Sequence, residues 1–106
     1  MLHTQPIATL RQLLTSREIS PADLLRSVES SIADTDSAIG AYLQRDFPTA
    51  LAEAEKADLT QPLGGIPIGI KDIINVNGQP LTCGSRILAG KFISPYDATV
   101  ITRLKA

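Results

Sequence analysis

The chain has 106 residues, of which 43% are hydrophobic, and its 10 basic and 11 acidic side chains give a net charge of −1 at pH 7. This composition is that of one ordinary globular domain, and it excludes a strongly basic surface for direct binding of nucleic-acid phosphates. A single cysteine excludes an internal disulfide, no apolar run is long enough to cross a membrane, and the first residues lack a signal or transit pattern, so we expect a cytoplasmic protein.

Two helix starts are predicted near the beginning of the chain. The first has Thr4 as its cap and a proline in its first turn. The second has Ser20 as cap, Pro21 at the first helical position and the acidic Asp23 in the first turn. Each start is followed by an apolar stripe. We therefore expect a helical hairpin over residues 1–33, which either packs on a larger body or forms a partner-binding surface.

The middle of the chain predicts a loop, a strand and a helix in that order. Residues 34–37 are all polar, which is typical of a loop. Apolar and polar residues alternate from Ile39 to Phe47, which predicts a half-buried strand. The Ala- and Glu-rich stretch from Pro48 to Asp58 predicts a helix that ends before a turn.

The stretch Ile66–Ile70 contains only apolar residues and glycine, as does a strand buried on both faces of an α/β sheet. Pro67 and Gly69 argue against a helix here. The apolar run stops at Lys71 and Asp72, and ligands of open α/β sheets gather at the carboxyl ends of strands. Lys71 is therefore a candidate catalytic residue. It is either a surface lysine that marks the end of the strand, or a desolvated lysine whose neutral amine serves as a general base.

Three further elements are predicted after this strand. Ile73–Val76 is a second extended stretch, Asn77–Gly78 is a turn because both residues tolerate positive φ, and Asp97 caps a helix over the last residues. A strand buried on both sides needs neighbours on both edges, and the last helix has barely begun to bury an apolar face. We therefore expect residues 39–106 to be the start of an α/β core, and the chain to be the N-terminal fragment of a single larger domain.

Two side chains in this part are possible nucleophiles. Cys83 lacks a plausible histidine base, because His3 is expected to lie in a frayed end, so we interpret it as a small buried residue. Ser85 is either a nucleophile or substrate contact, or the cap of a short helical turn through Leu88, and we favour the cap.

Residues Gly64–Asp72, which read Gly-Gly-Ile-Pro-Ile-Gly-Ile-Lys-Asp, resemble the lysine motif of the amidase signature family. Asn75–Gly78, Leu81–Leu88 and Ser94–Val100 are similar to segments of the A subunits of glutamyl-tRNA(Gln) amidotransferases, a branch of that family. The resemblance covers essentially the whole chain. It implies the N-terminal part of the amidase signature α/β/α fold, in which a helix pair precedes a mixed sheet with flanking helices.

The resemblance also implies that Lys71 is the base of a Ser-Ser-Lys triad, which performs acyl transfer without histidine or metal. The lysine deprotonates a bridging serine held by a cis peptide, and this serine activates the nucleophilic serine. Both serines belong to a Gly/Ser-rich segment that residues 72–106 lack, and Ser85 and Ser94 stand at other positions of the motif. We therefore expect the 106-residue chain by itself to be inactive.

For the complete protein, the resemblance implies hydrolysis of glutamine and transfer of the ammonia to a B subunit that amidates Glu-tRNA(Gln) or Asp-tRNA(Asn). The B and C subunits would complete a heterotrimer, with most of the tRNA contact and the use of ATP and magnesium in the B subunit, and with no cofactor, metal or membrane contact in this one. Two alternatives stay open, a free-standing amidase that acts on another carboxamide and a truncated, non-catalytic interaction module.

Overall fold

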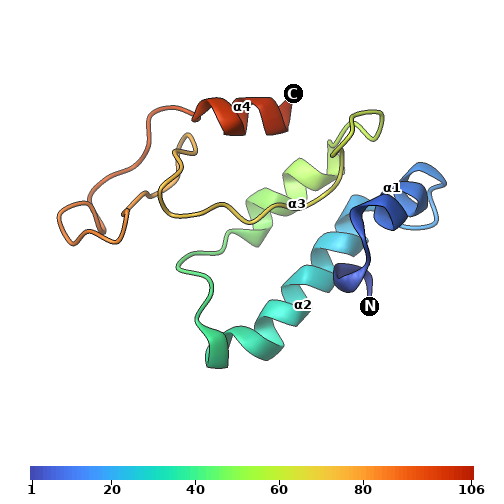
Figure 1. Cartoon of the computed structure of the whole chain (residues 1–106), viewed down its shortest axis with the longest axis horizontal. Helices are drawn as coiled ribbons and strands as arrows, with labels where there is room; N and C mark the ends of the chain where they lie inside the picture. Colours follow the sequence, from blue (N-terminus) through green and yellow to red (C-terminus); the bar gives the residue numbers. More distant parts are fainter. The chain divides into compact units, whose positions relative to one another are not determined.

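The computed structural model describes all residues from Met1 to Ala106, and its regular structure is helical (Figure 1). The elements are the 3-10 helix η1 (Leu2–Thr4) and the α-helices α1 (Ile7–Thr15), α2 (Pro21–Ile39), α3 (Phe47–Glu55) and α4 (Thr99–Lys105). The chain divides into two compact units, Met1–Pro67 and Ile68–Ala106. None of the helices combines the length and apolarity needed to span a lipid bilayer.

Helix α2 begins at the predicted cap. The hydroxyl of Ser20 accepts a hydrogen bond from the backbone N–H of Asp23 at 3.1 Å, and the Asp23 carboxylate accepts one from the backbone N–H of Ser20 at 2.9 Å. Pro21 occupies the first turn, where a missing N–H costs nothing. This reciprocal arrangement satisfies two donors that the helix itself leaves unpaired.

The loop predicted at residues 34–37 is wrong, because α2 continues to Ile39. The helix ends at Gly40, whose φ of 65° is the left-handed conformation that glycine adopts without strain. Asp36 is buried, and its carboxylate accepts a hydrogen bond from the backbone N–H of Ala41 at 2.7 Å. The polar residues therefore belong to the last turns of the helix and to its C-terminal cap.

The N-terminal segment is tied to α2, and the expectation of a frayed end is wrong. The Nδ1 atom of His3 lies 3.0 Å from the hydroxyl of Ser27, which also accepts a bond from the His3 backbone N–H at 3.3 Å. Thr4 does not cap α1, as its hydroxyl donates to the carbonyl oxygen of Met1. Pro6 stands at the cap position and, having no side-chain oxygen, makes no capping hydrogen bond.

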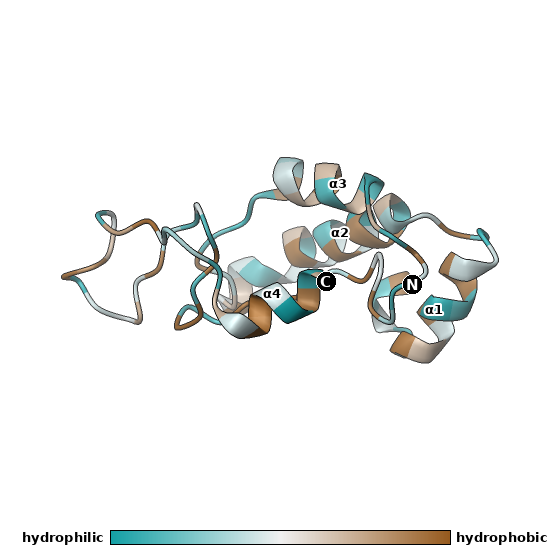
Figure 2. Ribbon diagram, turned by 90° about the horizontal axis from the view of Figure 1, so that it is seen from above, coloured by the Kyte–Doolittle hydropathy of each residue, from teal (hydrophilic) through white to brown (hydrophobic).

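The core of the Met1–Pro67 unit lies between α1 and α2. Leu10, Leu14 and Leu24 are buried together, and Figure 2 shows hydrophobic segments in brown on both helices. Four partly buried side chains pack around this cluster, Leu2, Ile19, Leu59 and Ile66. Burial of each leucine contributes about 1.5–3 kcal/mol, so the cluster stabilises the packing of α1 against the start of α2. Ile66, the first residue of the predicted central strand, is thus part of this core.

The turn that precedes Ile66 requires glycine. A Cβ atom at Gly64 would lie 1.9 Å from the carbonyl oxygen of Asp58, and Gly65 has a φ of 79°. Both conditions exclude side chains, since the first contact is with backbone and the second is strained for L residues. Before this turn, α3 is capped by Asp46, whose carboxylate accepts a hydrogen bond from the N–H of Thr49, and the helix ends at Glu55, three residues before the predicted end.

The predicted sheet is not formed by these residues. The only β pairing is an isolated antiparallel bridge between Pro80 and Ile93. The half-buried strand predicted from Ile39 to Phe47 is wrong, because Ile39 ends α2, Phe47 begins α3, and residues 41–46 between them are irregular and exposed. The run after Ile66 is also irregular, and Ile68 and Ile70 are 45% and 40% exposed. A strand is stabilised by hydrogen bonds to a neighbouring strand, and no other segment of this chain supplies them here.

The Ile68–Ala106 unit is built around a tight turn, as predicted. Gly78 has a φ of 78°, and the N–H of Gln79 donates to the carbonyl of Val76 at 3.0 Å. The turn is also bonded to a later segment. The N–H of Gly78 donates to the carbonyl of Ser94 at 2.8 Å, and the N–H of Ser94 donates to the carbonyl of Gln79 at 2.9 Å. These bonds bring the segments before and after residues 82–91 side by side.

Helix α4 forms where predicted, although Asp97 is not its cap. The cap position is held by Ala98. Asp97 instead accepts hydrogen bonds from the backbone N–H of Asn77 at 2.7 Å and from the ammonium of Lys105 at 3.2 Å. Its carboxylate therefore joins the tight turn to the last helix.

Candidate functional site

Lys71, the predicted catalytic residue, lies in the irregular segment at the start of the second unit. Its side chain is exposed and makes no hydrogen bond or ion pair within the chain. Its carbonyl oxygen accepts a hydrogen bond from the N–H of Ile74 at 3.0 Å. Within these 106 residues, Lys71 is therefore a surface lysine. Its role in catalysis stays a prediction.

The neighbouring residue, Asp72, is held firmly by the loop ten residues later. Its carboxylate accepts hydrogen bonds from the backbone N–H of Thr82, at 2.8 Å, and from the Thr82 hydroxyl. Its carbonyl oxygen accepts a bond from the N–H of Cys83 at 2.9 Å. The hydrogen bonds from the Thr82 hydroxyl and then the Thr82 backbone lower the pKa of Asp72 below its usual value, since they stabilise the anion. Asp72 is therefore charged at neutral pH.

The loop at residues 82–85 has two consecutive residues with positive φ, Cys83 at 50° and Gly84 at 70°. The N–H of Gly84 donates to the Thr82 hydroxyl oxygen at 3.2 Å, and the N–H of Ser85 donates to the Thr82 carbonyl at 2.8 Å. The N–H groups of residues 82–85 are thus all used within the unit. This loop can position the backbone, but it offers no spare donors to stabilise an oxyanion.

Cys83 is exposed, contrary to the expectation that it is buried. It occupies the left-handed position of a tight surface turn, where its side chain has no core to enter. Sequence reasoning missed this position because positive φ at a residue other than glycine has no reliable sequence signal. No imidazole lies in the Ile68–Ala106 unit, so the unit offers no histidine base for a cysteine nucleophile.

The two serines of this unit have structural roles. The Ser85 hydroxyl accepts from the N–H of Ile87 at 3.2 Å, and its carbonyl accepts from the N–H of Leu88, which confirms the predicted cap of a short turn. Ser94 is only 1% exposed. Its hydroxyl accepts from the side-chain amide of Asn75 at 2.9 Å and donates to the carbonyl of Tyr96 at 2.7 Å. The structure thus pairs neither hydroxyl with a lysine or histidine.

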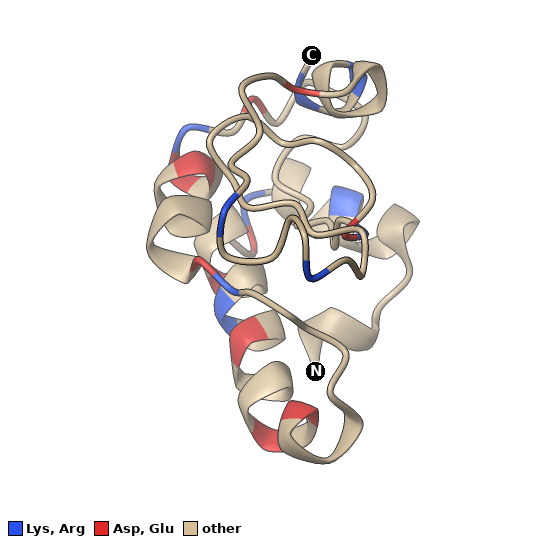
Figure 3. Cartoon of the chain, turned by 90° about the vertical axis from the view of Figure 1, so that its left-hand side faces the viewer, with Lys and Arg blue, Asp and Glu red and all other residues tan.

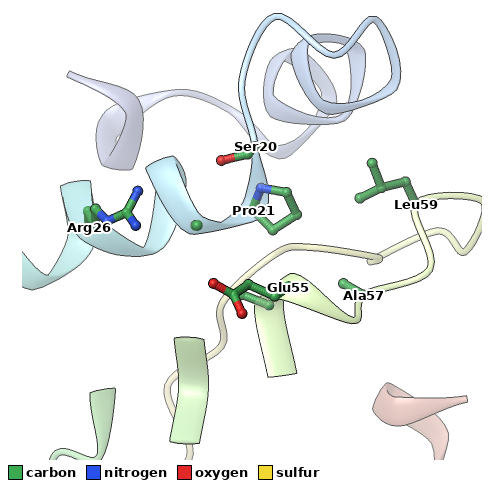
Figure 4. A pocket seen from close by; sticks show the side chains of 8 residues that line it. Ser20, Pro21, Arg26, Glu55, Ala57 and Leu59 are labelled. Atoms are coloured by element: carbon green, nitrogen blue, oxygen red, sulfur yellow. The ribbon is translucent and has the colours of Figure 1, made fainter. Parts of the chain in front are cut away.

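The first unit has a hollow of about 450 Å³ between the start of α2 and the end of α3 (Figure 4), and a second hollow of about 430 Å³ beside α1. The first of these is lined by Arg26 and Pro21 from α2, by Glu55 from α3 and by Leu59, which lies on the opposite side of Pro21 from Arg26. Arg26 is already paired with Asp23 at 3.5 Å. No group of three or more His, Cys, Asp or Glu side chains is placed to hold a metal ion. Lys and Arg residues are scattered along the chain and do not gather in one segment (Figure 3).

Comparison with known proteins gives a consistent result. The family model described as Amidase matches residues 23–106, which include Lys71 and the loop at residues 82–85. The chain is 46% identical over 99 residues to the glutamyl-tRNA(Gln) amidotransferase A subunit of Methylacidiphilum infernorum, a match that covers 93% of this chain and 20% of that protein. It is 44% identical to the protein of the same name from Akkermansia muciniphila, over 93% of this chain and 21% of the relative. The chain thus spans about a fifth of the length of these curated relatives.

A solved structure gives a match of the same kind. It is described as an inhibitor-bound vestigial protein complex that reveals the evolutionary origins of an s-triazine catabolic enzyme. The TM-score is 0.87 and the identity 26%, with 95% of this chain and 24% of the other chain covered.

Proposed function

The chain belongs to the amidase family, and from that membership we propose that it is part of the glutamine-hydrolysing A subunit of a tRNA-dependent amidotransferase. The observation that carries this proposal is the 46% identity to a relative of that name, which extends over 93% of the chain. Because the chain spans about a fifth of such relatives, the proposal concerns the complete protein, with residues 1–106 as the N-terminal part of one amidase domain.

Lys71 acts in this proposal as the general base of a Ser-Ser-Lys triad. Its neutral amine takes a proton from a bridging serine, which takes one from the nucleophilic serine. The nucleophile attacks the side-chain amide carbon of glutamine, the C–N bond breaks, and ammonia leaves with a proton returned through the same groups. Water then releases glutamate from the acyl-enzyme. In support, the carboxylate of the neighbouring Asp72 is bonded to Thr82 and does not pair with the Lys71 side chain.

The rest of the amidase domain supplies what residues 1–106 lack. Both serines and the oxyanion donors would come from sequence outside these residues. The run Ile66–Ile70 would pair there with strands of a mixed sheet, and this pairing would bury Ile68 and Ile70, whose side chains are half exposed in the 106-residue chain. Burial of this run would also remove water from around Lys71 and so favour the neutral amine.

The ammonia passes to a B subunit, which uses ATP and magnesium to activate Glu-tRNA(Gln) or Asp-tRNA(Asn), and a C subunit completes a cytoplasmic heterotrimer. The glutamine-hydrolysing protein itself needs no cofactor, because covalent catalysis by serine and lysine requires none. The scattered basic residues support a division of labour in which the B subunit makes most of the tRNA contact.

A second candidate is a free-standing amidase that acts on another carboxamide. The likeness to the solved structure bears on the substrate alone, because its description names an s-triazine catabolic enzyme but also calls that protein part of a complex. Coexpression of the complete protein with B and C subunits separates the two candidates. Copurification and glutamine-dependent amidation of Glu-tRNA(Gln) support the first. A protein that stays apart from both subunits and hydrolyses other amides faster than glutamine supports the second.

A further inference from the structure

We propose that Asp72 and Thr82 form a clamp that positions Lys71 for its work as a base. This inference rests on the proposed function of Lys71 and adds a role for two residues outside the triad. We define the clamp as the two hydrogen bonds from Thr82, one from its N–H and one from its hydroxyl, to the Asp72 carboxylate. Asp72 and Thr82 are positioning residues, and neither takes part in proton transfer.

The clamp fixes the main chain directly after Lys71. The Asp72 side chain is bonded to Thr82, the Asp72 carbonyl to the N–H of Cys83, and the Lys71 carbonyl to the N–H of Ile74. A lysine side chain has four rotatable bonds, so its amine is placed well only if its Cα atom is held and its path is confined. A displacement of about 1 Å in a reacting group costs up to about a hundredfold in rate. Since Lys71 lies in an irregular segment, these bonds are what this unit provides to hold it.

The Thr82 hydroxyl is suited to this task because both of its hydrogen-bonding functions are used. The oxygen accepts from the N–H of Gly84 at 3.2 Å while its proton is donated to Asp72. The bonds also hold Cys83 in its left-handed conformation, which is unfavourable at a residue other than glycine. A valine at position 82 keeps the volume and loses both bonds of the hydroxyl. A serine keeps both bonds and loses only a methyl group.

The test compares Thr82→Val with Thr82→Ser in the complete protein assembled with its B and C subunits. Glutamine hydrolysis gives kcat and KM for each, and transamidation from added ammonia reports whether the assembly is intact. We expect Thr82→Val to lower kcat for glutamine by about tenfold to a hundredfold with little change in KM, and to leave ammonia-dependent transamidation unchanged. Thr82→Ser should stay within about threefold of the unsubstituted protein in kcat.

Three results would overturn the proposal. The first is a normal kcat in Thr82→Val, and the second is an equal loss in Thr82→Ser. The third is an equal fall of both activities in Thr82→Val, since the clamp would then hold the whole protein together rather than Lys71 in particular. Lys71→Ala in the same assay keeps the two proposals apart. If Lys71→Ala is inactive and Thr82→Val is normal, only the clamp fails, whereas an active Lys71→Ala defeats the proposed function and the clamp together.

Discussion

The guanidinium group of Arg11 donates a hydrogen bond to the carbonyl oxygen of Gly64 at 3.2 Å, across 53 residues of sequence. Its other terminal nitrogen donates to the carbonyl of Leu59 at 3.0 Å. Arg11 belongs to α1, and the two carbonyls belong to the glycine turn that leads into Ile66. One side chain of α1 therefore holds the turn from which the predicted central strand starts.

Arg11→Ala should loosen this turn. Hydrogen bonds from a charged donor are each worth about 1.5–3 kcal/mol, and the planar fork of arginine reaches two carbonyls that the single ammonium of lysine would not span. We expect amide hydrogen exchange of Gly64 and Ile66 to become at least about tenfold faster, because their N–H groups bond within this turn.

Arg45→Ala is the matched control for that measurement. Arg45 is exposed and makes no hydrogen bond within the chain, so its removal should leave exchange at Gly64 and Ile66 unchanged. Equal exchange in the Arg11 and Arg45 variants would contradict the role that the structure gives to Arg11.

Ser94→Ala should destabilise the protein without removing a catalytic group. The substitution leaves the amide of Asn75 and the carbonyl of Tyr96 without their partner at a site that is 1% exposed, which costs about 1–3 kcal/mol. The thermal midpoint should fall, while kcat for glutamine measured well below that midpoint should stay within about twofold. A loss of kcat as complete as that of Lys71→Ala would show that Ser94 belongs to the triad after all.

The sequence predicts those features that depend on neighbouring residues. Ser20, Pro21 and Asp23 define the start of α2 because a capping box is closed within four residues. The end of this helix is harder to predict, because polarity alone does not distinguish a loop from an exposed helix face. Gly40, which ends the helix in the left-handed conformation, is the more specific signal.

Features that depend on distant residues are not predictable in the same way. An apolar run such as Ile66–Ile70 identifies a segment suited to burial, but a strand forms only where a partner is present, and residues 1–106 supply none. The bond between Asp72 and Thr82 escapes prediction for a related reason. It depends on a turn with positive φ at Cys83, a conformation that the residue type does not indicate.

Stability should fall in acid. Hydrogen bonds lower the pKa of four aspartates. For Asp23, Asp58 and Asp72 the main donor is the hydroxyl of a nearby Ser or Thr, and for Asp97 it is the backbone N–H of Asn77. Because each pKa is lower in the folded than in the unfolded state, the stabilisation is complete above the unfolded value of about 4 and is lost as the pH falls through the folded values.

The measurement is the thermal midpoint of the complete protein between pH 7 and pH 3. We expect the thermal midpoint to fall once the pH is lower than about 4. The fall should be smaller in Asp72→Asn, because this variant lacks one of the four carboxyl groups whose pKa is lowered by folding. Asp34→Asn serves as control, since Asp34 is exposed and accepts no hydrogen bond within the chain. A midpoint that does not change from pH 6 to pH 3 would contradict the prediction.

The role of Lys71 is tested most directly by Lys71→Ala in the complete protein assembled with its B and C subunits, with Lys91→Ala as an exposed-lysine control. The account predicts that Lys71→Ala abolishes glutamine-dependent transamidation of Glu-tRNA(Gln) and preserves transamidation from added ammonia, because only the release of ammonia needs the base. Lys91→Ala should keep both activities. Full glutamine-dependent activity in Lys71→Ala would contradict the assignment of this lysine as the base.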